Sequence, residues 1–212
     1  MGRSAMEIKM KIIAHRTISA EYPPNSIESL LFLVEHGILA VEFDVCKSAG
    51  GRLVVAHPGI IAKEKLESAC LLTDFLQACN SLGVDVFIDV KFTDRKFDLS
   101  FLNSVMQAVF KARMERHSVI VSNSKKALSQ FRGIIRIGYI TPEVRPEFFC
   151  LYDVLLIPMV KVQDDIMALD QWRAKLVITE VGISNLSIMR MFHPYALMTD
   201  NAVEIQALIN TG

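Results

Sequence analysis

The sequence predicts an α/β fold, a parallel (β/α)8 TIM barrel. Short apolar runs rich in β-branched residues alternate with amphipathic stretches along the chain, as expected when each parallel strand is followed by a helix on the outer face of the sheet. The alternation repeats eight times. Roughly 200 residues is the lower limit for eight such units in a closed barrel. An open doubly wound sheet is the competing architecture, and we favour the barrel.

The eight units follow one another as a strand and then a helix. Asn25 and Ser26 provide polar caps where the first helix begins. The strands are expected at Lys11–His15, Leu39–Asp44, Val86–Val90, Ser118–Val121, Arg136–Ile140, Val154–Met159, Leu176–Thr179 and Ala196–Thr199. The helices are expected at Ser26–Glu35, Leu72–Leu82, Asp98–Ala112, Lys125–Phe131, Pro146–Cys150, Asp164–Arg173, Asn185–Arg190 and Ala202–Ile209.

The second strand is expected to fold back on itself as a hairpin. A second apolar run ends at His57, and Gly50 and Gly51 lie between the two runs. A Gly-Gly pair between two strand-like runs is typical of a tight hairpin turn. A turn centred on these two glycines sets His57 opposite Asp44. The hairpin therefore brings a histidine back to the mouth of the barrel.

Length and composition indicate one domain with a large core. Of the 212 residues, 51% are apolar and 22% charged, and no Pro/Gly/Ser-rich stretch divides the chain. Such a composition excludes extensive disorder, and a chain of this length is sufficient for one well-buried domain. We therefore expect a single barrel domain over 10–212. Residues 1–9 fit no element, and we interpret them as an N-terminal arm or a remnant of expression.

Charge and hydropathy exclude several kinds of partner. Lysine plus arginine equals aspartate plus glutamate at 23 each, which argues against binding to nucleic acid or to anionic membrane surfaces. No apolar run is long enough for a membrane span or a signal-peptide core, so we expect a cytoplasmic protein. The sequence leaves open whether it forms a homo-oligomer. Without a C-x-x-C pair, neither a zinc cluster nor a disulfide framework is indicated for Cys46, Cys70, Cys79 and Cys150.

Acidic side chains gather at the ends of two neighbouring strands. Glu42 and Asp44 alternate with apolar residues, as do Asp89 and Lys91 on the next barrel strand. Because side chains alternate between the faces of a strand, these residues point into the barrel when the apolar ones face the helices. They lie near the C-terminal ends of the strands, where the active sites of such barrels are found.

Three carboxylates at one mouth favour a divalent metal. Partly desolvated like charges repel one another unless they are protonated or neutralised by a cation. Oxygen ligands suit a hard ion such as Mg²⁺ or Ca²⁺ and argue against a zinc site. The alternative is an internal ion network, in which Glu42 and Asp44 pair with Arg16 and Lys91. An E-x-D pair on a strand is, by itself, more often of this second kind.

Two histidines and two basic residues complete the predicted site. His15 and Arg16 end the first strand beside the same mouth, and His57 flanks it from the hairpin. Two imidazoles provide one group to take a proton and another to give one. Arg16 and Lys91 are suited to hold phosphate oxygens.

The remaining polar candidates carry less weight. His36 lies at the end of a helix and is interpreted as structural. His117 and His193 precede their strands and should not reach the mouth. Residues on the correct side, which can equally serve as helix caps or loop residues, are Ser122, Asn123, Glu180 and Asp200.

These motifs resemble the glycerophosphodiester phosphodiesterase family. Its signature runs from His-Arg-Gly through Pro-Glu-Asn-Thr to Glu-x-Asp and His-Asp, followed by Glu-x-Lys and a closing Thr-Asp. Order and spacing agree over almost the whole chain, and the first third is the most specific. The matching stretches are His15-Arg16-Thr17, Pro23-Pro24-Asn25-Ser26, Glu42-Phe43-Asp44, His57-Pro58, Asp89-Val90-Lys91 and Thr199-Asp200.

The resemblance implies a barrel enzyme of glycerol and lipid metabolism. Such an enzyme hydrolyses glycerophosphodiesters to glycerol 3-phosphate and an alcohol with the help of a divalent metal, Mg²⁺ or Ca²⁺. By motif position, the metal ligands would be Glu42, Asp44 and Asp89, the acid/base pair His15 and His57, and the phosphate ligands Arg16 and Lys91.

Four positions depart from the family pattern. Thr17 replaces the glycine, Pro24 the first glutamate, and Pro58 the aspartate after the second histidine, while Asp89 is one methylene shorter than the family's glutamate. These changes keep two alternatives open. One is a barrel that binds phosphate without turnover, and the other is a related barrel that cleaves lysophospholipids.

Overall fold

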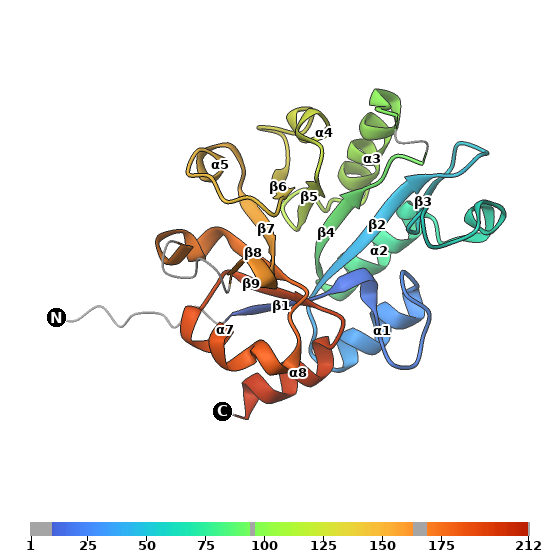
Figure 1. Cartoon of the computed structure of the whole chain (residues 1–212). Coiled ribbons are helices and arrows are strands. Elements are labelled where there is room, and N and C mark those ends of the chain that lie inside the picture. The colour runs from blue at the N-terminus through green and yellow to red at the C-terminus, as the bar shows by residue number, and fades with distance from the viewer. Residues whose placement is uncertain (1–9, 94–95, 163–168, 212) are drawn as a thin grey trace.

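The computed structural model describes residues 10–93, 96–162 and 169–211. Eight parallel strands form its central sheet, and a short ninth strand extends one edge of β2 (Figure 1). The strands are β1 (Lys11–Ala14), β2 (Ala40–Lys47), β3 (Leu53–Val55), β4 (Asp85–Val90), β5 (Ser118–Ser122), β6 (Arg136–Ile140), β7 (Val154–Pro158), β8 (Leu176–Thr179) and β9 (Ala196–Thr199).

The parallel strands close into a ring. The first strand pairs with the last, with Ala14 opposite Thr199, and also with β2, where Ala14 lies opposite Val41. Each remaining barrel strand pairs in parallel with its neighbours. The predicted (β/α)8 barrel is therefore confirmed, and the open sheet is excluded.

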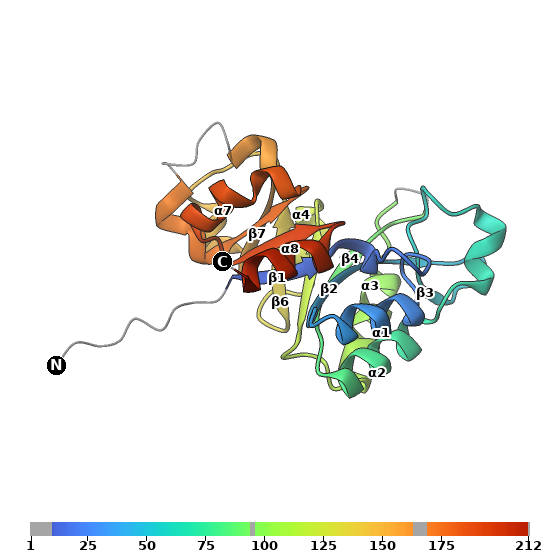
Figure 2. The same ribbon diagram turned by 90° about the horizontal axis from the view of Figure 1, so that it is seen from below.

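Helices cover the outside of the barrel. Figure 2 shows α1, α2 and α3 together outside β2 and β4, with α7 and α8 on the other side. Ser26 and Asp98 cap α1 and α3 by accepting hydrogen bonds from Ser29 N and Phe101 N. The α-helices are α1 (Ile27–Glu35), α2 (Leu72–Leu82), α3 (Leu99–Lys111), α4 (Lys125–Ser129), α5 (Phe148–Leu151), α7 (Leu186–Phe192) and α8 (Ala202–Asn210). The 3-10 helices are η1 (His15–Thr17), η2 (Lys63–Ser68), η3 (Asp170–Lys175) and η4 (Ile183–Asn185).

Two expected elements differ from the structure. His15 does not end β1 but begins η1. The helix expected at Asp164–Arg173 lies partly outside the described residues, and its described end belongs to the 3-10 helix η3. Among the described residues no helix is both long and apolar enough to cross a bilayer.

A separate apolar cluster, which we call the barrel floor, fills the inside of the ring. Its members alternate along their strands with residues that pack under the helices. Gly138 makes room for it, since a Cβ there would lie 2.8 Å from Val121 Cγ1 and 2.9 Å from Leu156 Cδ1. The floor therefore fills the barrel interior below the mouth, as in other small barrels. It consists of Ile13, Ala40, Phe87, Val119, Val121, Val154, Leu156, Val177, Ala196 and Met198.

The hairpin after β2 forms, but its register differs from the expected one. Ser48 N donates to Arg52 O at 2.9 Å, so residues 49–51 form the loop. Gly51, its last residue, has a φ of 82°. This is a three-residue loop whose last residue is left-handed, instead of a two-residue turn. Ala56 N donates to Asp44 O at 3.0 Å, so the prediction that His57 lies opposite Asp44 is wrong by one residue.

Candidate active site

Three buried carboxylates, which we call the acidic triad, converge inside the barrel mouth. Glu42, Asp44 and Asp89 are only 3%, 1% and 6% exposed. Asp44 lies directly opposite Asp89 in the parallel ladder between β2 and β4. One carboxylate oxygen from each residue lies within 4.8 Å of the others. Strand alternation thus puts Glu42 and Asp44 on the same inward face of β2 as Ala40, and Asp89 on the same inward face of β4 as Phe87.

Burial makes the ionised forms of Glu42 and Asp89 costly. Desolvation, followed by the charges of Asp44 and Asp89, raises the pKa of Glu42 well above its ordinary value. Desolvation also raises the pKa of Asp89 to about 6, although Lys91 opposes the change. Carboxylates in this state bind either a proton or another cation more tightly than carboxylates in water.

Two basic side chains neutralise part of this charge. Lys91 Nζ lies 2.5 Å from Asp89 Oδ2 and 3.6 Å from Asp44 Oδ1. Although burial alone would lower it, the pKa of Lys91 is raised by the charge of Asp89. Arg16 Nε lies 3.3 Å from Asp44 Oδ2. Contacts of the kind expected for an internal ion network are therefore present beside the acidic triad.

The donor set also fits a divalent ion. Within the described part of the chain, the buried Asp44 Oδ2 has no hydrogen-bond partner, despite its nearness to Arg16. Two basic side chains leave the three carboxylates incompletely neutralised. Asp44 carries an unpartnered oxygen, and the acidic triad as a whole offers three carboxylate ligand atoms within 4.8 Å of one another. Such a set suits a hard cation such as Mg²⁺ or Ca²⁺. The residues present therefore fit the expected metal.

The turn after β1 is left-handed and positions Arg16. Arg16 and Thr17 have φ of 51° and 47°, and Asn25 has φ of 59°. Thr17 Oγ1 accepts a hydrogen bond from Asn25 N at 2.9 Å, and Ser29 Oγ donates to Thr17 O. A left-handed conformation is unfavourable for a β-branched residue. The family's glycine at this position would adopt it more easily, and here hydrogen bonds hold Thr17 in place.

His15 is held between two carboxylates. Its Nδ1 lies 2.7 Å from Asp200 Oδ1, and its Nε2 lies 3.9 Å from Glu42 Oε2. Arg16 N, the next backbone amide, donates to Glu42 Oε2 at 2.9 Å. The sequence places Asp200 on the correct side of the barrel, and its pairing with His15 becomes visible only in the structure.

His57 lies two residues beyond the end of β3, on the returning side of the hairpin. Desolvation lowers its pKa, and the charges of Asp44, Lys91 and Arg16 also act on the imidazole. Gly59 N donates to His57 Nδ1 at 3.0 Å. A Cβ at Gly59 would lie 3.1 Å from His57 Cε1, so the ring and this backbone approach closely. No sequence signal marks Gly59.

The other polar candidates lie as follows. His36 Nδ1 contacts Phe32 O at 2.8 Å at the end of α1, consistent with a structural role. His117 pairs with Asp85 at the start of β4, at the opposite end of the strand from Asp89. Ser122 Oγ accepts from Ser124 N and so contributes to a loop.

A cavity of about 450 Å³, the mouth cavity, opens above the acidic triad. Its polar lining residues include His15, Arg16, Asp89, Glu180 and Asp200. Floor residues such as Val121 and Leu156 form its base. The cavity is therefore lined by both charged and apolar side chains.

Comparisons with known proteins agree with this architecture. No family model matches the chain, and no curated protein matches it in sequence. A glycerophosphodiester phosphodiesterase from Parabacteroides distasonis has a similar structure, with TM-score 0.82, 19% identity and coverage of 95% of this chain and 97% of that one. Another from Agrobacterium tumefaciens has TM-score 0.72 and 17% identity, covering 96% and 100%.

A phosphodiesterase from Oleispira antarctica, solved with the product sn-glycerol-3-phosphate, has TM-score 0.74 and 17% identity, covering 94% of this chain and 96% of that one. The chain therefore has the barrel fold found in these phosphodiesterases. The resemblance first indicated by short motifs extends to the whole fold.

Proposed function

We propose that this chain is a metal-dependent phosphodiesterase that hydrolyses glycerophosphodiesters to glycerol 3-phosphate and an alcohol. The observation that carries the proposal is the acidic triad, buried at the barrel mouth with its ligand atoms within 4.8 Å of one another. Solved structures of similar fold are described as glycerophosphodiester phosphodiesterases, which supports the same reaction here.

The metal site consists of Glu42, Asp44 and Asp89. A bound Mg²⁺ or Ca²⁺ would supply positive charge that neutralises phosphoryl oxygens and activates a bound water or hydroxyl. Arg16 and Lys91 border the acidic triad, and their guanidinium and ammonium groups hold the other phosphate oxygens.

The hydrogen bonds of the two histidines suggest different roles. Asp200 accepts from His15 Nδ1, which leaves His15 Nε2 free to take a proton from the attacking water as its oxygen bonds to phosphorus. His57 supplies a proton to the departing alcohol oxygen as the other phosphorus–oxygen bond breaks. Its lowered pKa makes the imidazolium a stronger acid, and one that is less populated as pH rises.

The proposal is tested by measuring glycerol 3-phosphate released from glycerophosphocholine and related diesters. Release should require a divalent metal and stop with chelator. His15→Ala should lower kcat/KM by about 10²–10⁴-fold, the usual contribution of a general acid or base. His36→Ala is the matched control, because His36 lies at the end of α1 and contacts only that helix among the hydrogen bonds described.

A barrel that binds phosphate without turnover is the second candidate. Its support is the 2.5 Å contact of Lys91 with Asp89, which partly neutralises the acidic triad without a metal. Binding of glycerol 3-phosphate with no release from any diester of a broad panel, with or without Mg²⁺ and Ca²⁺, would select this function instead.

A further inference from the structure

Glu180 follows β8 at the barrel mouth, and the activity proposed above assigns no role to it. The residue is exposed and lines the mouth cavity. In the closed ring, β8 is separated from β4 by β5, β6 and β7 in one direction and by β2, β1 and β9 in the other. Glu180 therefore lies across the barrel from Asp89, and a ligand that extends from the acidic triad over the mouth reaches it.

The backbone of Glu180 has a left-handed conformation, with a φ of 60°. This conformation is uncommon for residues other than glycine. Two hydrogen bonds hold the residues that follow, because Thr199 Oγ1 donates to Val181 O at 2.7 Å and Gly182 N donates to Asn185 Oδ1 at 3.3 Å. Strained backbone that neighbouring contacts maintain is frequent at binding sites. The fold thus fixes the point from which the Glu180 side chain extends.

The carboxylate of Glu180 differs from those of Asp89 and Asp200, which also line the mouth cavity. Asp89 pairs with Lys91, and Asp200 pairs with His15. Among the residues that the structure describes, none forms a hydrogen bond or an ion pair with the Glu180 carboxylate. Its oxygens are therefore available to accept hydrogen bonds from a ligand.

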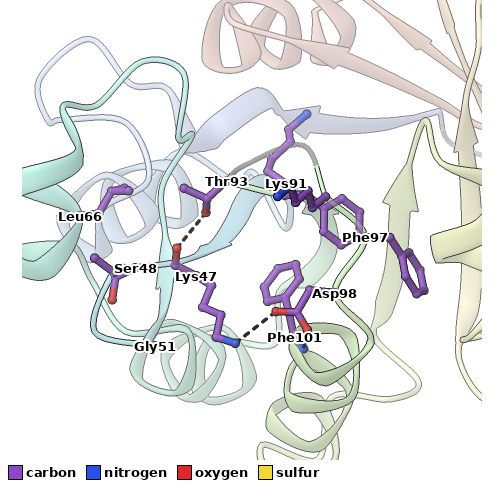
Figure 3. Close-up of a pocket in the computed structure, with 12 residues that line it drawn as sticks. Lys47, Ser48, Gly51, Leu66, Lys91, Thr93, Phe97, Asp98 and Phe101 are labelled. Carbon is purple, nitrogen blue, oxygen red and sulfur yellow. Dashed lines mark hydrogen bonds and ion pairs between the residues drawn. The ribbon is translucent and has the colours of Figure 1, made fainter.

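A second cavity, of about 400 Å³, lies beside the β2–β3 hairpin and differs in this respect. Figure 3 shows Lys47 directed toward Asp98, and the two side chains pair at 3.1 Å. Asp98 also accepts from Phe101 N at the start of α3. The carboxylate of this second cavity is thus engaged within the protein. Of the two cavities, the mouth cavity has the available acceptor.

The charge of Glu180 determines which end of a ligand it binds. An ionised carboxylate accepts hydrogen bonds and repels phosphate oxygens. The phosphate therefore belongs near Arg16 and Lys91, and the groups that reach Glu180 must be hydrogen-bond donors. Ile140 and Met198 also line the cavity and suit a short carbon chain. A polyol phosphate has this polarity, with phosphate at one end and hydroxyl donors at the other.

We propose that Glu180 is a specificity-determining residue, which accepts hydrogen bonds from the hydroxyl groups of the glycerol arm bound in the mouth cavity. The terminal hydroxyl, which is farthest from the phosphate, is the one that reaches Glu180. This inference rests on the proposed binding of glycerophosphodiesters at the acidic triad and assigns one arm of the substrate to a position in that same site.

The test compares two phosphodiesters that share para-nitrophenol as the alcohol, so that its release is followed by absorbance. The other arm is glycerol in one and propane-1,2-diol, which lacks the terminal hydroxyl, in the other. The wild type should have a kcat/KM at least about tenfold higher for the glycerol diester, as expected for one hydrogen bond to a charged group. Glu180→Gly should bring this ratio close to one, and glycine adopts the left-handed backbone without strain.

Two more variants separate recognition from structure. Glu180→Gln keeps the shape and one acceptor oxygen, so it should retain part of the preference for the glycerol diester. Glu35→Gln, at the C-terminal end of α1, is the matched control and should leave the ratio unchanged. An unchanged ratio in Glu180→Gly, with both diesters still cleaved, would overturn the role of Glu180 and leave the proposed function standing.

Binding provides a readout that does not depend on turnover. Calorimetry with Mg²⁺ measures the Kd of glycerol 3-phosphate and of the phosphate monoester of propane-1,2-diol. In the wild type the Kd of glycerol 3-phosphate should be about tenfold lower, and in Glu180→Gly the two values should be equal. A wild type that cleaves neither diester would overturn the proposed function alone, because the two Kd values still test Glu180. Equal Kd values in the wild type would overturn the inference.

Discussion

The barrel floor and the acidic triad are built on the same strands yet differ in what they contribute. Ala40 and Phe87 pack in the floor, and Glu42 and Asp89 follow two residues later on the same inward faces of β2 and β4. Apolar burial at the floor stabilises the fold. Burial of neighbouring carboxylates destabilises the metal-free protein. Two residues along each strand therefore separate side chains that stabilise the fold from buried carboxylates that do not.

The largest expected effect is the change of stability with pH that the buried Asp89 carboxyl produces. In the metal-free protein the pKa of Asp89 is raised from 3.8 to about 6, so the folded state holds the proton more tightly than the unfolded state. The contribution of Asp89 to the free energy of unfolding therefore falls by about 3 kcal/mol as pH rises through the range between these two pKa values. This size follows from about 1.4 kcal/mol per pKa unit.

Urea denaturation of the wild type and Asp89→Asn across this pH range measures the effect. In the variant, the free energy of unfolding should no longer show the decrease with rising pH that Asp89 produces in the wild type. Mg²⁺ should raise the stability of the wild type mainly above about pH 6, because protons compete with the metal for the carboxylates. Parallel pH profiles of the two proteins would contradict the assigned pKa.

Gly138→Ala tests the floor alone. The added Cβ would lie within 2.9 Å of three side chains from Val121, Val154 and Leu156. Overpacking of this kind costs about 1–3 kcal/mol, which should appear in thermal unfolding. Metal affinity should be unchanged, since none of these residues belongs to the acidic triad. Loss of metal binding together with stability would show that the two layers are coupled.

Glu42→Gln tests the acidic triad alone. Glutamine can still accept from Arg16 N, as Glu42 does, but it carries no buried charge. We expect the metal-free variant to gain on the order of 1 kcal/mol in stability near neutral pH. The stabilisation by Mg²⁺ should disappear. A variant less stable than the wild type without metal would mean that the carboxylate is held by favourable pairing instead.

The smallest effect is expected for Gly59→Ala. Its Cβ would lie 3.1 Å from His57 Cε1 and 3.3 Å from Nδ1, so the imidazole must shift by a few tenths of an ångström. We expect stability to change by about 0.5 kcal/mol or less, as for other surface substitutions, while kcat/KM falls several-fold. Equal kcat/KM in the two proteins would show that the position of His57 is not critical.

Sequence patterns predicted the parts of the molecule that follow from strand geometry. Alternation along β2 and β4 was sufficient to predict that Glu42, Asp44 and Asp89 converge. The position of His57 could not be predicted in the same way, because it depends on the type of hairpin loop. The loop has three residues instead of two, with Gly51 in the left-handed conformation, and this shifts the pairing of β2 with β3 by one residue.

One other feature could not be derived from local patterns. The contact between His15 and Asp200 joins residues that are 185 positions apart, so it depends on closure of the ring. Closure of the ring has no periodic signature in the sequence.

A crystal structure grown with Mg²⁺ or Ca²⁺ and glycerol 3-phosphate tests the central claim most directly. We predict one metal ion bound by oxygens of Glu42, Asp44 and Asp89 at about 2.0–2.6 Å, with a phosphate oxygen also on the ion. An acidic triad that holds only the Lys91 ammonium at saturating metal, with the phosphate bound elsewhere, would contradict it.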